Sequence, residues 1–372
     1  MNEKMILSQI NEFIAAKGYC CKDGLLEDLY LSLKSRPFVM ITGRSDTDLS
    51  LLPRLFAQAV GANEENGRLK VLQVRPDWMD SSDLFGWLNL EGKFIPGVMI
   101  DFLKAAQEDP DKPYFLLLDG ILLSRAEYYL RDVLNAIESA SQEQGQLPLV
   151  TLPYYGRDEV AIEKYGQIPV LKNLFIIGTL NLDTASLPLN QRFLDRMHTV
   201  SVAPEDITGA GDGAVDSLEL NSEFLETVYY RLEQCQHEAA LLREYFGVLE
   251  QLNKILAEAT AYIGFKVRND MILYLMHNRL TGVMTPDQAM DRAICHKILP
   301  RVQGSEKMVK DVLCKLFAYC AGFVGELSAE EPVSEIMKRL CHDPNCQYPV
   351  SAGHIARMTA ICEAEGFTSY WN

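Results

Sequence analysis

The sequence predicts an α/β protein with a mostly parallel sheet, helices on both faces of that sheet, and an all-helical region after it. Three apolar runs with the length of strands support this prediction, at residues 37–41, 114–119 and 174–181. Helical patterns follow these runs, and strands that alternate with helices favour a parallel sheet with right-handed crossovers. Continuous apolar runs are typical of parallel strands buried on both faces. Beyond residue 204 the pattern is helical only.

Three domains are expected from these patterns. A helical lead-in covers residues 1–35, the α/β core covers residues 36–203, and a helical lid with a C-terminal extension covers residues 204–372. A stretch rich in Gly and Asp at residues 205–221 is interpreted as the linker between core and lid.

The composition is that of an ordinary globular protein. Of the 372 residues, 48% are hydrophobic and 23% are charged, and the formal net charge is −16. An acidic chain repels nucleic acid and anionic membranes, so autonomous nucleic-acid binding is not expected. The chain shows neither a signal-peptide pattern nor an apolar run of about 18 residues, so we expect no membrane span. The nine cysteines lack the spacing of a disulfide framework, which predicts reduced thiols in a cytoplasmic protein.

Polar residues follow the predicted strands. Gly43 follows the first strand, Asp119 ends the second and Asn181 ends the third. The carboxyl ends of parallel strands lie at one edge of the sheet, and ligands bind at that edge in open α/β sheets. The sequence therefore predicts a candidate site there.

The stretch from Gly43 to Ser50 has the frame of a phosphate-binding loop without its chemistry. A working loop reads G-x-x-x-x-G-K-[S/T]. Here Gly43 and Ser50 have the right spacing, but Asp48 replaces the second glycine and Leu49 replaces the lysine. At roughly 5 Å and an effective dielectric near 20, a carboxylate beside a phosphate charge costs about 3 kcal/mol. The alternative is a polar loop in a protein unrelated to nucleotides.

Five segments in order resemble the AAA+ module of the McrB-type restriction NTPases. They are residues 43–50, 74–84, 118–129, 177–183 and 193–196. Residues 298–304 resemble part of the helical lid of that family, and the resemblance extends from about residue 10 to the C-terminus. It implies a P-loop-like core with a helical lid. It also implies ATP or GTP with Mg²⁺ as cofactors if the site is competent.

The resemblance implies retained and disabled positions in the loop. The retained cofactor-binding positions are Gly43, Ser45, Thr47 and Ser50. The disabling changes are Asp46, Asp48 and Leu49. Because these changes remove two glycines and the phosphate-binding lysine, no cofactor is expected.

The resemblance also implies catalytic positions outside the loop. Asp119 corresponds to the Mg²⁺-placing aspartate, a vestigial metal position, while Gly120 replaces the water-activating glutamate. Asn181 corresponds to the residue that orients the attacking water. Arg196 corresponds to the arginine that reaches a neighbour's γ-phosphate, a role that acts in trans. Two alternatives stay open: Asp119 only caps the next turn, and Arg196 pairs locally with an aspartate.

Two further features of the sequence are candidate site residues. Lys266 lies near the place of the lid's sensor arginine in a loose alignment. Cys341, His342 and Cys346 are candidate zinc ligands, but a full tetrahedral set is not visible nearby, so helix-end and loop roles are favoured.

The expected function is a hydrolysis-deficient assembly or regulatory subunit in a prokaryotic defence system. The expected partners are further copies of the chain or an active AAA+ paralogue, with a McrC-like or nuclease protein. A separate domain that reads nucleic acid is not expected, since fewer than 40 residues precede the first strand. Two alternatives remain: a weakly active ATP- or GTP-binding NTPase that uses a neighbour's arginine, and a stand-alone module that binds another ligand.

Overall fold

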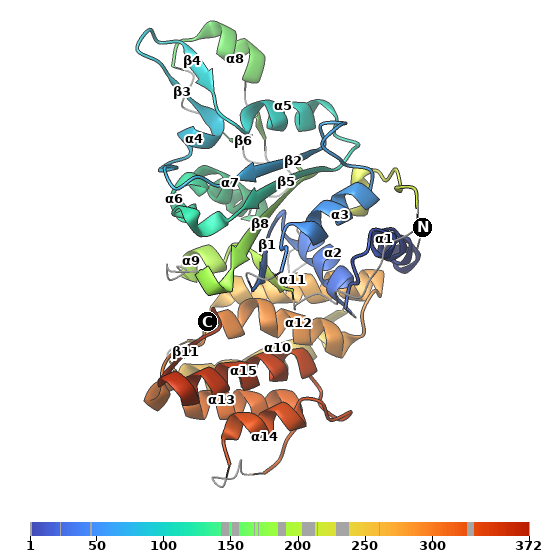
Figure 1. Cartoon of the computed structure of the whole chain (residues 1–372), viewed down its shortest axis with the longest axis vertical. Helices are drawn as coiled ribbons and strands as arrows, with labels where there is room; N and C mark the ends of the chain where they lie inside the picture. The colour runs from blue at the N-terminus through green and yellow to red at the C-terminus, as the bar shows by residue number, and fades with distance from the viewer. Residues whose placement is uncertain are drawn as a thin grey trace. The chain divides into compact units, whose positions relative to one another are not determined.

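The computed structural model of the chain forms two compact units (Figure 1). The first, called the sheet unit, comprises Met1–Leu26, Arg36–Pro188 and Ser201–Val228. The second, called the helical unit, comprises Glu27–Ser35, Leu189–Val200 and Tyr229–Asn372. The structure describes residues 2–22, 24–44, 47–142, 149–150, 156–166, 168–169, 171–184, 191–202, 213, 215–227, 238–259, 261–325 and 331–371.

A five-stranded sheet with the order β2-β5-β8-β1-β9 forms the centre of the α/β fold (Figure 1). Its strands are β1 (Phe38–Gly43), β2 (Leu69–Gln73), β5 (Tyr114–Asp119), β8 (Leu174–Asn181) and β9 (His198–Ser201). The pairs β2–β5, β5–β8 and β1–β8 are parallel. Every residue of β1 is buried, as expected for a parallel strand covered on both faces. The predicted α/β, P-loop-like fold is confirmed.

Helices flank the sheet (Figure 1). Those of the sheet unit are α1 (Glu3–Ala16), α3 (Leu51–Ala59), α4 (Ser82–Phe85), α5 (Ile100–Glu108), α6 (Ala126–Tyr129), α7 (Arg131–Gln142) and α8 (Glu159–Tyr165). The side chain of Asn2 caps α1 by accepting a hydrogen bond from the Lys4 N–H. Leu130 separates α6 from α7.

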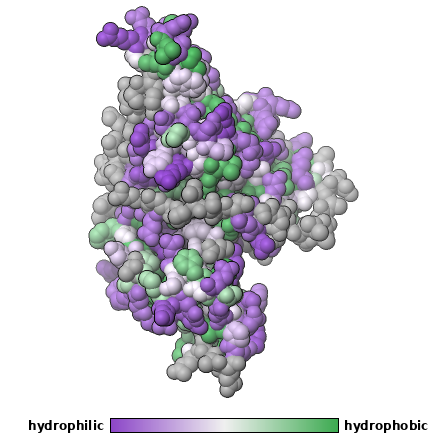
Figure 2. Space-filling model, turned by 60° about the vertical axis from the view of Figure 1, so that its left-hand side comes forward, coloured by the Kyte–Doolittle hydropathy of each residue, from purple (hydrophilic) through white to green (hydrophobic). Residues whose placement is uncertain are grey.

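Two short antiparallel strand pairs are separate from the five-stranded sheet. β3 (Gly86–Leu88) pairs with β4 (Phe94–Pro96), and β6 (Leu149–Val150) pairs with β7 (Ile168–Pro169). Strands of this length show no measurable period, so the sequence did not predict them. The β3–β4 hairpin exposes apolar side chains, and green patches lie among polar ones at the top of the view in Figure 2. The exposed side chains are Trp87, Leu88 and Leu90.

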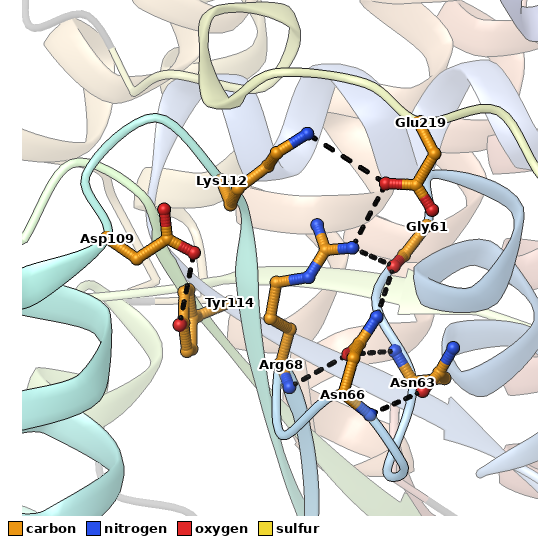
Figure 3. A network of polar contacts seen from close by, with 8 residues as sticks. All are labelled: Gly61, Asn63, Asn66, Arg68, Asp109, Lys112, Tyr114 and Glu219. Carbon is orange, nitrogen blue, oxygen red and sulfur yellow. Dashed lines mark hydrogen bonds and ion pairs between the residues drawn. The ribbon is translucent and has the colours of Figure 1, made fainter.

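A polar network attaches the segment around Glu219 to two turns of the sheet unit (Figure 3). The buried Arg68 donates to the Gly61 carbonyl, and its Nη2 lies 3.2 Å from the Glu219 carboxylate. Lys112 lies 3.8 Å from the same carboxylate. The end of the expected linker, residues 215–221, is therefore part of the sheet unit, while most of residues 205–214 lie outside the described residues.

The helical unit contains most of the helices expected after residue 204. Its helices are α2 (Leu25–Ser35), α9 (Gln191–Leu194), α10 (Ala239–Ala257), α11 (Phe265–Thr281), α12 (Pro286–Lys297), α13 (Glu306–Ala321), α14 (Val333–Leu340) and α15 (Pro349–Glu365). A capping box of Thr285 and Gln288 begins α12. The strands β10 (Gln303–Ser305) and β11 (Phe367–Ser369) form an antiparallel pair that the sequence did not predict. Within the described ranges, no helix is long and apolar enough to span a bilayer.

Candidate functional site

The sheet places the predicted strand-end residues at one edge. Gly43 of β1 is the register partner of Asn181 of β8, and Asp119 of β5 is the register partner of Gln73 of β2. The Asp119 carboxylate reaches β8 through a hydrogen bond of 2.6 Å from the Thr179 hydroxyl. All of these residues stand at the carboxyl ends of parallel strands, where such sheets bind their ligands.

In the loop between β1 and α3, a carboxylate accepts hydrogen bonds from donors of the same loop. The Asp48 carboxylate accepts from the Ser50 backbone N–H at 3.0 Å and from the Ser50 hydroxyl at 2.8 Å. Ser50 immediately precedes α3, so its N–H is among the groups that a helix start presents to an anion. In this loop the anion is a side-chain carboxylate of the chain itself. Ser45 and Asp46 lie outside the described residues.

Leu49 is buried and apolar, whereas the lysine at this place in a working loop is charged and contacts phosphate. Its side chain is 7% exposed and lies against the end of β1. A Cβ at Gly43 would meet a Leu49 methyl group at 2.6 Å, so the absence of a side chain at Gly43 is what admits Leu49. Full burial of a leucine side chain stabilises a fold by about 1.5–3 kcal/mol. Hydrophobic packing therefore holds this part of the loop.

Thr47 is also turned inward. Its hydroxyl is buried, and it has no hydrogen-bond partner within the described part of the chain. Of the retained loop positions, Gly43 thus contacts Leu49, Ser50 binds Asp48, and Thr47 is buried.

Asp119 is held by two neutral donors. One carboxylate oxygen accepts from Thr179 Oγ1 at 2.6 Å, and the other accepts from Gln73 Nε2 at 2.6 Å. Asp119 would offer one carboxylate to Mg²⁺, which is typically bound by one or two carboxylates together with substrate phosphates. Among the described residues no group of three or more His, Cys, Asp or Glu side chains could hold a metal ion.

Gly120 has a backbone conformation that few other residues adopt. Its φ is +71° and its ψ is +50°, in the left-handed region, and a Cβ would lie 2.8 Å from a Leu123 methyl group. Its N–H donates to Thr179 Oγ1 at 2.9 Å. The place where the resemblance implies a water-activating glutamate therefore favours glycine for local steric reasons.

Asn181 and Arg196 belong to different units. The Asn181 side-chain oxygen accepts a hydrogen bond from the Asp183 N–H at 3.0 Å, and Asn181 lies in the sheet unit. Arg196 is half-buried and lies in the helical unit. The neighbouring Asp195 carboxylate pairs with Arg301. Lys266 lies in the first turn of α11 and is half-buried.

The candidate zinc residues make local contacts. Cys341 Sγ donates to the Lys338 carbonyl at 3.1 Å, and Cys346 Sγ lies 3.9 Å from the Cys320 carbonyl oxygen. Burial raises the pKa of both the Cys341 and the Cys346 thiols, which disfavours the thiolate form that binds metals.

Sequence reasoning missed the two side chains that hold Asp119. Thr179 precedes Asn181 by two residues, so both point to the same face of β8, and Gln73 ends a strand of the same sheet. A search for polar residues at strand ends would have found Gln73, whereas Thr179 lies two residues before the end of β8.

Comparisons with known proteins agree with the fold. Residues 217–367 match the sequence model of a family described as "Domain of unknown function (DUF8727)". No curated protein matches the chain. A crystal structure from Cytophaga hutchinsonii, of a protein whose assignment as an ATPase is itself inferred, is 13% identical with a TM-score of 0.51. That similarity covers 84% of this chain and 96% of the other.

NtrX from Brucella abortus is 14% identical over 93% of this chain and 64% of its own, with a TM-score of 0.27, too low to indicate a shared fold. The sheet order and the first structural similarity support the same conclusion: the chain has an α/β P-loop-like fold.

Proposed function

We propose that this chain is a hydrolysis-deficient AAA+-like subunit that acts by assembly and not by turnover. The observation that carries the proposal is the Asp48 carboxylate, which accepts both the backbone and the hydroxyl hydrogen bonds of Ser50. A phosphate would have to displace this carboxylate and approach it as a like charge. The repulsion is about 3 kcal/mol per charge at roughly 5 Å and an effective dielectric near 20.

Two further features support loss of hydrolysis. Leu49 is packed against Gly43 and supplies no charge to a phosphate. Gly120 has no carboxylate to polarise a water, and its left-handed backbone disfavours the residue that would supply one. Nucleotide binding is thus impaired in the loop, and hydrolysis is impaired separately at Gly120.

The proposed setting follows from the resemblance to McrB-type restriction NTPases. In this setting the chain is an assembly or regulatory subunit of a prokaryotic defence system, and it associates with its own copies or with an active AAA+ paralogue. A McrC-like or nuclease protein is the proposed downstream partner. Arg196 is the residue proposed to contact the neighbouring subunit, since such an arginine acts in trans.

A weakly active NTPase is the second candidate. Asp119 and Asn181 remain at the carboxyl edge of the sheet, where a nucleotide's metal and attacking water would lie. A nucleotide-binding chain of this kind would use them with an arginine from a neighbour.

Phosphate release and light scattering separate these candidates. The full chain is incubated with Mg²⁺ and ATP or GTP, and its mass in solution is measured with and without nucleotide. The proposal predicts background phosphate release and an oligomer that forms without nucleotide. Turnover above background contradicts it and favours the weak NTPase. A chain that stays monomeric, alone and with co-encoded proteins, favours a stand-alone binding module.

A further inference from the structure

The backbone on both sides of Arg196 is held by buried side chains from the end of α12 and the turn after it. Lys297 Nζ donates to the Met197 carbonyl at 2.6 Å and to the Asp195 carbonyl at 3.3 Å. Arg301 pairs with the Asp195 carboxylate and donates through Nε to the Lys297 carbonyl at 2.9 Å. These residues all belong to the helical unit.

The cations of this cluster are buried and paired. Lys297 is 2% exposed and Arg301 is 7% exposed. The Lys297 ammonium has three N–H donors, and it lies near three acceptors, the two carbonyls and the Asp270 carboxylate at 3.4 Å. Lys297 and Arg301 face two carboxylates, those of Asp270 and Asp195, so the charges balance.

Helix α12 also contacts His198, the residue after Met197. His296 Nδ1 lies 3.2 Å from His198 Nδ1, and His296 Nε2 lies 3.0 Å from the Asp28 carboxylate. Both histidines are buried. Three residues near the end of α12, His296, Lys297 and Arg301, therefore contact residues 195, 197 and 198.

We propose that Lys297 and Arg301 are positioning residues for Arg196. They fix the backbone before and after it, so that the arginine meets a neighbouring subunit in one orientation. This inference rests on the proposed function, in which Arg196 contacts that neighbour. Buried ion pairs commonly add little net stability over hydrophobic residues of the same size, and a role in specifying one conformation accounts for the presence of these pairs.

The test uses variants of the full chain in which a buried ion pair is replaced as a whole or keeps its charge. The double variant Lys297→Met with Asp270→Leu removes both members of one pair and is expected to fold, because apolar replacement of a whole buried pair is commonly tolerated. Arg301→Lys is the second variant. A lysine keeps the charge but cannot donate to Asp195 and to the Lys297 carbonyl in the geometry of a guanidinium. Lys338→Met, at the exposed pair with Glu335, is the matched control.

Two measurements are made on each variant. In hydrogen exchange, we expect a peptide spanning residues 191–199 to exchange about tenfold faster in the double variant, with α13 unchanged, because local openings depend on local contacts. In light scattering, we expect the double variant and Arg196→Ala each to raise the concentration of half-assembly about tenfold, the size of a typical buried interface arginine. Arg301→Lys should change both readouts in the same direction, and Lys338→Met should change neither.

The outcomes separate this inference from the function on which it rests. Unchanged exchange at residues 191–199 in the folded variants overturns it. So does wild-type assembly in the positioning variants when Arg196→Ala assembles poorly. If Arg196→Ala itself assembles as the wild type does, the proposed role of Arg196 fails first and this inference fails with it. Should the double variant not fold, Arg301→Lys decides by the same criteria.

Discussion

The Asp48 carboxylate accepts the backbone N–H of Ser50 at 3.0 Å and its hydroxyl at 2.8 Å. In a working phosphate loop the corresponding donors face a nucleotide and its metal. Here one residue of the chain accepts both. Both hydrogen-bond donors of Ser50 are therefore occupied by a carboxylate of the same loop.

Restoring the loop residues should restore nucleotide binding. In the triple variant Asp46→Gly, Asp48→Gly and Leu49→Lys, the Ser50 donors are released and a cation is added. We expect submillimolar ATP binding by calorimetry with phosphate release still at background, because Gly120 is unchanged.

Asp80→Gly is the matched control for the loop variant. Asp80 accepts from the N–H and the hydroxyl of Ser82 in the same way, but in the turn before α4. This variant should bind no nucleotide. A triple variant that binds no ATP would show that the pocket is closed by other contacts.

A glutamate at position 120 should destabilise the fold. Gly120→Glu forces a side chain into a left-handed conformation, at a cost of about 1–3 kcal/mol, and its Cβ would approach Leu123. Gly120→Asn should cost less, since asparagine tolerates this region. Urea unfolding of both variants measures the difference, and equal stabilities would argue against backbone strain at this position.

Two threonines on adjacent strands should respond oppositely to the same substitution. Thr179→Val removes the acceptor of the Gly120 N–H and a donor to Asp119, with an expected loss of about 1–3 kcal/mol. The buried Thr42 hydroxyl has no partner among the residues described, so Thr42→Val should be neutral or stabilising. Thermal unfolding compares the two, and a Thr42→Val variant less stable than the wild type would contradict the expectation for an unsatisfied hydroxyl.

His354 should make the fold less stable in mild acid. Burial, aided by the charges of Arg357 and Arg292, lowers the pKa of His354 to about 3. Below about pH 6.5 the unfolded chain takes up a proton that the folded chain takes up only near its own lower pKa. Stability is therefore lost as the pH falls through this window, by up to about 1.4 kcal/mol per pH unit.

The variant His354→Gln tests this linkage. Urea unfolding between pH 7 and pH 4.5 should show a shallower pH dependence than in the wild type, because the glutamine does not titrate. The exposed His342, changed to glutamine in the same way, is the control. Identical slopes in the wild type and His354→Gln would rule out this histidine as the cause.

The sequence allowed the sheet and its edge to be predicted because strand periodicity is a local property. Asp119 and Asn181 end long apolar runs, which places them at the carboxyl edge of any parallel arrangement. The direction of a side chain was not predictable in this way. The spacing of the loop identified Asp48 as a change of charge, but not as the acceptor for Ser50.

Other features depend on contacts between distant residues. Asp28 accepts a hydrogen bond from Tyr274 at 2.7 Å. The sequence around neither residue indicates this contact, because the two are far apart in the chain. This contact lies within the helical unit, which includes α2 although the sequence assigned that helix to the lead-in. Gly120 was interpreted as a missing carboxylate, while its left-handed backbone appears only in three dimensions.

Calorimetric titration of the unmodified chain with ATP and with GTP, in the presence of Mg²⁺, tests the central claim most directly. Because Asp48 occupies the donors of Ser50 and Leu49 supplies no charge, we predict no heat of binding at submillimolar nucleotide. Saturable binding in that range would contradict the claim that the Asp48 carboxylate occupies the hydrogen-bond donors of the loop.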